Sequence, residues 1–219
     1  MSLPAWAQVS PARRAHIERV VAQLRSWADA MHVDPRERDR WLRAGWLHDV
    51  LRDAPLGDPL AHGPAAADRA AAEGERDRGV LDAVRYHTVG SPAWDDVGRM
   101  LYLADFLEPG RDRIAADRAE LAQRVPVERD VVLREVARRR IEWLLRSGWP
   151  LPITTVAFWN QLVGRSDGLT VGKSSSPRSW YRCCPSVRPS DGPTVRIHQP
   201  STVASASASS IGPAFDLGS

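Results

Sequence analysis

Residues 46–53, "WLHDVLRD", place a histidine and an aspartate side by side inside an apolar run. His48 and Asp49 have two apolar residues on each side. Neighbours on a helix point about 100° apart, so at least one of the two side chains is expected to be buried. A buried carboxylate is costly unless a cation or strong donors lie beside it. The segment therefore predicts either a hydrogen-bonded pair in the core or part of a metal site.

Around this segment the spacing of apolar residues predicts helices and no strands. Ser10-Pro11 and Asp34-Pro35 each combine an N-cap residue with proline in the first turn, which is typical of helix starts. The second of these helices is expected to run through His48 and Asp49 and to end at Pro55. Further helices are predicted over residues 65–74, 79–88, 95–109, 127–148 and 153–163. The predicted class is all-α.

After Gly164 the composition changes to serine, proline, glycine and arginine with almost no apolar periodicity. Such a segment cannot bury enough apolar surface to offset the entropy of ordering it. We therefore expect a domain over residues 1–164 and a Ser/Pro/Arg-rich disordered tail over residues 165–219. The only two cysteines, Cys183 and Cys184, are adjacent and lie in this tail, so they form no disulfide framework.

The net charge of +3 resides entirely in the predicted tail, which carries six basic and three acidic side chains. Residues 1–164 are therefore neutral, which argues against a nucleic-acid partner, since phosphate contacts need a concentrated basic face. No uninterrupted apolar run approaches the length of a membrane span, and the N-terminus lacks a signal-peptide pattern. We expect a cytoplasmic protein with no membrane partner.

Other histidines and an aspartate accompany the His48-Asp49 pair on separate predicted helices or their loops. They are His16, His62, His87 and Asp105. Taken singly, each could cap a helix or line the core. Taken together, they are the ligand types that suit iron, manganese or zinc, and packed helices can each project one ligand into a shared cavity.

The order of these residues resembles that of the HD-domain metal-dependent phosphohydrolases. Four segments are similar to the YqeK-type subgroup, the bacterial symmetrical bis(5'-nucleosyl)-tetraphosphatases: "HDVLRD" from residue 48, "AHGPAAA" from 61, "RYHTVGSP" from 85 and "YLADFLEPGR" from 102. The resemblance covers about residues 10–163 and implies an HD-domain helical bundle.

The resemblance also implies a site with two divalent or trivalent metal ions, of which iron is favoured and manganese or zinc are alternatives. One ion would be held by His16, His48, Asp49 and Asp105, and the other by Asp49, His62 and His87. Asp49 would bridge the two ions, and a water activated between them would hydrolyse diadenosine tetraphosphate to two ADP.

Two arginines are expected to act on the phosphates in this reaction. Arg111 follows the Glu-Pro-Gly segment, and Arg52 stands where the family usually has lysine. A guanidinium can hold phosphate oxygens bidentately, so Arg52 is expected to keep this function. Together with Asp49, Arg52 and Arg111 form the expected catalytic group. Thr88 and Gly90 are expected to shape the substrate-binding loop that carries His87, glycine allowing a close backbone approach.

Two other functions stay open on the sequence alone. The chain could be an HD-domain nucleotidase or phosphodiesterase acting on other nucleotides, because metal ligands define the chemistry and not the base or the chain length. It could also be a degenerate nucleotide-sensing module, although the complete ligand set counts against this. The expected partner is a nucleotide polyphosphate substrate, and whether the chain forms a homodimer stays open.

Overall fold

The computed structural model describes residues 2–110 and 115–164, in which all regular secondary structure is helical. This confirms the predicted all-α class for the described part of the chain. The predicted tail, residues 165–219, and Arg111 lie outside the described residues. The helices are α1 (Pro11–Ala30), α2 (Pro35–Leu47), α3 (His62–Ala72), α4 (Arg78–Tyr86), α5 (Asp96–Leu107), α6 (Ala115–Arg146) and α7 (Ile153–Gly164).

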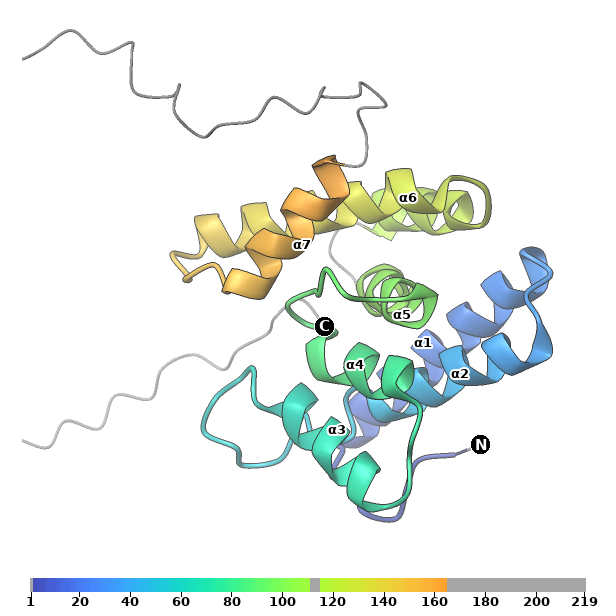
Figure 1. Cartoon of the computed structure of the whole chain (residues 1–219), viewed down its shortest axis with the longest axis vertical. Helices are drawn as coiled ribbons and strands as arrows, with labels where there is room; N and C mark the ends of the chain where they lie inside the picture. Colours follow the sequence, from blue (N-terminus) through green and yellow to red (C-terminus); the bar gives the residue numbers. More distant parts are fainter. Residues whose placement is uncertain (1, 111–114, 165–219) are drawn as a thin grey trace, which may run out of the picture. The chain divides into compact units, whose positions relative to one another are not determined.

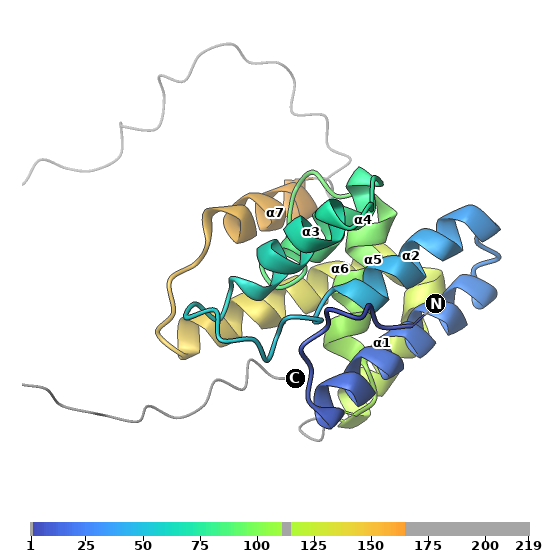
Figure 2. The same cartoon turned by 90° about the horizontal axis from the view of Figure 1, so that it is seen from below.

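The first two helices begin as their sequences predict. The Ser10 hydroxyl accepts a hydrogen bond from the Arg13 N–H, and the Asp34 carboxylate accepts one from the Arg36 N–H. Each side chain thereby satisfies a backbone donor that the helix itself leaves unpaired. The two helices form an antiparallel pair (Figures 1 and 2).

Helix α5 forms the centre of the fold and contacts α1, α2, α4 and α6 (Figure 1). Met100, Leu101 and Leu103 are fully buried although they point in different directions around the helix. A helix that is apolar on all sides is typical of a core position. Asp105, a polar residue on this helix, is therefore buried among the neighbouring helices.

The two largest errors in the predicted helix boundaries concern α2 and α6; α3 also begins at His62, three residues earlier than predicted. Helix α2 ends at Leu47, and the chain continues through His48 as C-cap into a turn that contains Asp49. This turn buries His48, Asp49 and Val50 together, whereas a helix continued to Pro55 would turn successive side chains about 100° apart. Helix α6 begins at Ala115, twelve residues before the predicted start at residue 127.

A kink explains why only the second part of α6 was expected. Pro126 lies inside the helix, and Glu128 has non-helical angles of φ −124° and ψ 34°. Proline removes one backbone donor and its ring crowds the preceding turn, which bends a helix without preventing its continuation. None of the helices in the described part of the chain is both long and apolar enough to cross a membrane.

The loop between α4 and α5 packs tightly against α7. Gly90 has φ +84°, and a Cβ atom there would lie 2.5 Å from Cδ1 of the buried Phe158. The Thr155 hydroxyl donates a 2.6 Å hydrogen bond to the Val89 carbonyl oxygen. The loop that follows His87 is thus held against α7 by one tight packing contact and one hydrogen bond.

Replacing Gly90 by alanine is expected to destabilise the fold by about 1–3 kcal/mol, because positive φ strains a residue with a Cβ atom and the ring of Phe158 must move. Gly57→Ala is the matched control, since Gly57 has φ +75° but no atom within 4 Å of the added Cβ. Urea denaturation should give a larger loss for Gly90→Ala than for Gly57→Ala. Equal losses would contradict the tight packing against α7.

Candidate metal centre

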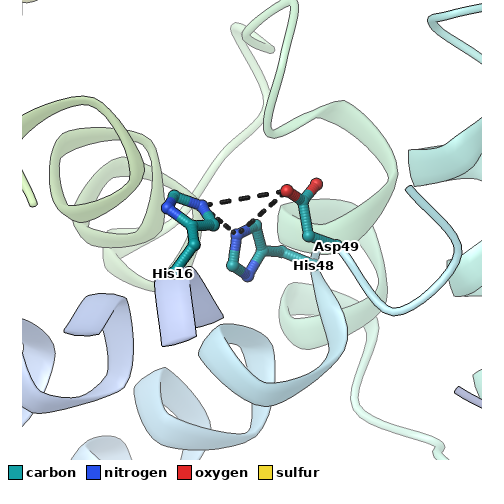
Figure 3. A group of neighbouring side chains, drawn as sticks. All are labelled: His16, His48 and Asp49. Atoms are coloured by element: carbon teal, nitrogen blue, oxygen red, sulfur yellow. Dashed lines mark hydrogen bonds and ion pairs between the residues drawn. The ribbon is translucent and has the colours of Figure 1, made fainter. Parts of the chain in front are cut away.

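The side chains predicted as metal ligands converge at the ends of several helices. His16 comes from α1, His48 and Asp49 from the end of α2, His62 from the start of α3, His87 from the C-cap of α4, and Asp105 from α5. All six residues are buried, and none is more than 7% exposed. Figure 3 shows His16, His48 and Asp49, whose side chains point toward one another.

Asp49 lies between two pairs of histidines. Its Oδ1 atom is 3.2 Å from Nε2 of His62 and 3.2 Å from Nε2 of His87. Its Oδ2 atom is 3.8 Å from Nε2 of His16 and 3.9 Å from Nε2 of His48 (Figure 3). Each carboxylate oxygen thus faces a different pair of imidazoles.

Hydrogen bonds at Nδ1 fix the orientation of the four imidazoles. Nδ1 donates to a backbone carbonyl three residues earlier in three cases: His48 to Gly45 at 2.7 Å, His62 to Pro59 at 2.8 Å and His87 to Val84 at 2.7 Å. Nδ1 of His16 lies 3.2 Å from Oε1 of Glu108. An imidazole that donates from Nδ1 and is neutral has its lone pair on Nε2, and tethering of this kind is typical of metal-binding histidines.

The tethered imidazoles face each other in pairs through these Nε2 atoms. The Nε2 atoms of His16 and His48 are 3.3 Å apart, and those of His62 and His87 are 3.1 Å apart. Two nitrogens this close need a proton or a metal ion near both, because two bare lone pairs would repel each other. The residues therefore fit metal ions, and the ligand atoms form two groups within 4.8 Å that share Asp49: His16, His48 and Asp49, and Asp49, His62 and His87.

The protonation of the histidines favours the same conclusion. Burial lowers the pKa of His48 to about 4 and also lowers the pKa of His62, so both imidazoles are neutral at neutral pH. Burial lowers the pKa of His16 too, but hydrogen bonds with Asp105 and Glu108 outweigh it and raise the pKa above its usual value. A metal ion at His16 would thus compete with a proton.

The carboxylates at the centre remain ionised. Burial raises the pKa of Asp49, but the surrounding imidazoles of His48, His62 and His87 stabilise its charged form and lower the pKa well below its usual value. Burial likewise raises the pKa of Glu108, and hydrogen bonds from His16 and Arg19 lower it to about 2. The centre therefore combines carboxylate oxygens with imidazole nitrogens, which is the ligand set of a cation site.

Several charged residues that the sequence reasoning missed support this centre. Arg13 donates from Nη1 to Oδ2 of Asp49 at 2.7 Å, and Arg140 donates from Nη2 to Oδ2 of Asp105 at 2.7 Å. Arg13 lies three residues before His16 on α1, a spacing that places both on one helix face and that could have indicated it. Arg140 lies 35 residues from Asp105, and no local pattern links the two.

Two of the four predicted substrate-binding residues, Arg52 and Thr88, lie beside His62. Nη1 of Arg52 donates to the Pro59 carbonyl at 2.8 Å and lies 3.2 Å from Nδ1 of His62. The Thr88 hydroxyl lies 3.4 Å from Nε2 of His62. Gly90 instead lies against Phe158, and Arg111 lies outside the described residues. The structure thus brings Arg52 and Thr88 to the centre.

Comparison with known proteins identifies relatives of this chain. It is 31% identical over 108 residues to the symmetrical bis(5'-nucleosyl)-tetraphosphatase of Halalkalibacterium halodurans, covering 49% of this chain and 57% of the relative. The protein of the same name from Bacillus subtilis is 30% identical over 108 residues, with the same shares covered. The matches thus span little more than half the length of these curated relatives.

A solved structure shares the fold. The crystal structure of a protein from Clostridium acetobutylicum, described as a predicted HD superfamily hydrolase involved in NAD metabolism, matches with a TM-score of 0.63 and 25% identity. The match covers 72% of this chain and 92% of that protein. The HD domain model itself matches residues 13–142, a range that includes all six clustered side chains. Because this match covers more than half of the chain, the protein belongs to the HD-domain family.

Proposed function

We propose that this protein is a metal-dependent phosphohydrolase that cleaves diadenosine tetraphosphate symmetrically into two ADP. The observation that carries the proposal is the pairwise opposition of four tethered Nε2 atoms on the two sides of Asp49. The relatives named symmetrical bis(5'-nucleosyl)-tetraphosphatase support the choice of substrate.

Two metal ions are assigned to the centre in this proposal. His16, His48, Asp49 and Asp105 would hold one, and Asp49, His62 and His87 the other. Iron is the ion that we propose, and manganese and zinc suit the same ligands. Ions bound here would acidify a water and stabilise negative charge on phosphoryl oxygens.

The residues around the centre would position the substrate. Arg52 presents a guanidinium beside His62, where it can hold phosphate oxygens, and the Thr88 hydroxyl can donate to another. Arg111 keeps the phosphate-binding function proposed from the sequence. We assign Gly90 to the support of the loop after His87, since its backbone lies against Phe158. Holding the tetraphosphate in one register decides which bond is cut.

Asp49→Asn is expected to remove both metal ions, because the change takes a charged oxygen from each pair of histidines. Asp53→Asn is the matched control: Asp53 lies near the same arginine, Arg13, but is part-exposed and outside the cluster. Elemental analysis after loading with iron or manganese should find about two ions per chain in the wild type and in Asp53→Asn.

Circular dichroism should show that both variants keep their helical content. If folded Asp49→Asn retained one ion at full occupancy, the bridging function of Asp49 would be wrong.

The wild-type protein, loaded with iron, manganese or zinc, is expected to convert diadenosine tetraphosphate to ADP alone. Attack at an inner phosphorus of the symmetrical tetraphosphate leaves a nucleoside diphosphate on both sides of the broken bond. Anion-exchange chromatography of the products measures this directly. AMP and ATP in equal amounts would indicate a different register, and no turnover with any of the three metals would refute the proposed activity.

A further inference from the structure

A cavity of about 280 Å³ lies beside the candidate metal centre. Its wall includes Thr88, whose hydroxyl is 3.4 Å from Nε2 of His62, and Arg140, whose Nη2 is 2.7 Å from Oδ2 of Asp105. The same two residues thus touch both the metal-ligating side chains and the cavity. The cavity thus adjoins the centre through these two residues.

Aromatic side chains form much of the rest of the wall. Tyr102 and Phe106 come from α5, Trp143 from the last turn of α6, and Trp149 from the segment that leads to α7. Trp143 is 38% exposed and lines the cavity, so part of its ring is accessible to a ligand. Flat aromatic faces of this kind stack on nucleobases irrespective of their sequence.

The charge of the wall suits a polyphosphate. Four arginines and one glutamate line the cavity. Cζ of Arg140 lies 4.3 Å above the centroid of the Tyr102 ring, and Nη1 donates to the Thr88 carbonyl at 3.3 Å. Nε of Arg140 is buried and has no hydrogen-bond partner among the described residues. The guanidinium of Arg140 thus lies between the aromatic wall and the carboxylate of Asp105.

The aromatic wall also extends past the part of the chain that matches the HD family. The family match ends at residue 142, directly before Trp143, and Trp149 lies farther along. The ligands of the centre all lie within the match, between residues 16 and 105. Trp143 and Trp149 thus belong to the segment after the residues that the family model matches, where a family can change its substrate preference.

We propose that this cavity binds one nucleobase of a nucleoside polyphosphate whose phosphates reach the metal centre, and that Trp143 determines the preference for nucleotides over bare phosphates. This proposal adds where the base of the substrate binds, and it rests on the proposed function for the position of the phosphates. A volume of about 280 Å³ lies at the lower end of small-molecule sites, typically about 300–1,000 Å³, so the cavity takes one nucleoside and leaves the second outside.

Calorimetric titration of the metal-loaded protein with ADP and with inorganic pyrophosphate tests this inference. Trp143→Ala is expected to weaken ADP binding about tenfold and to leave pyrophosphate binding unchanged, because only ADP carries a base to stack. Trp143→Phe should restore most of the lost affinity, since it retains an aromatic face. Leu145→Ala is the matched control, because Leu145 is 60% exposed on the same helix and does not line the cavity.

The outcomes separate this inference from the proposed function. Unchanged ADP binding in Trp143→Ala, or an equal loss for ADP and pyrophosphate, would overturn the nucleobase site. If the wild type bound ADP in a Trp143-dependent manner but did not hydrolyse diadenosine tetraphosphate, the cavity would stand and the proposed substrate would be wrong. Absence of ADP binding to the metal-loaded wild type would overturn the nucleobase site.

Discussion

The buried carboxylate of Asp49 is the constraint on which the rest of the centre depends. It is 4% exposed, and four imidazoles and the guanidinium of Arg13 surround it within 4 Å. Taking such a charge out of water is costly unless positive charge compensates it. Arg13 compensates one oxygen, and the close pairs of Nε2 atoms on both sides of Asp49 require a proton or a metal ion beside them. The core is thus organised around a group that is stable there only with positive charge beside it.

The helices meet this constraint by ending at the centre. Helix α2 stops at Leu47 so that His48 and Asp49 enter a buried turn, α3 begins at His62, and α4 ends just before His87. The last carbonyls of α2 and α4 lack helical partners, and those of Gly45 and Val84 accept hydrogen bonds from Nδ1 of the histidines that follow. The Pro59 carbonyl, in the turn before α3, accepts one from Nδ1 of His62. The same hydrogen bonds satisfy the backbone and orient the imidazoles, so the fold and the site share one set of contacts.

Much of the fold could be predicted from the sequence, because caps and apolar spacing are local signals. The side chains that cluster in the candidate centre could be named from the order of the histidines along the chain. The exact end of α2 could not be predicted, since burial of His48, Asp49 and Val50 together is decided by the surrounding helices. Pro126 hid the first part of α6, because proline is read as a helix end and here produces only a kink. Arg140 and the aromatic cavity depend on contacts between distant segments, for which a single sequence contains no pattern.

Crystals of the metal-loaded protein, measured at the absorption edge of the bound metal, would show directly whether Asp49 lies between two ions. We expect two anomalous peaks on opposite sides of the Asp49 carboxylate, one beside His16 and His48 and the other beside His62 and His87. A single peak on one side, or no peak with Arg13 still bonded to Oδ2 of Asp49, would show that Asp49 does not bridge two metal ions.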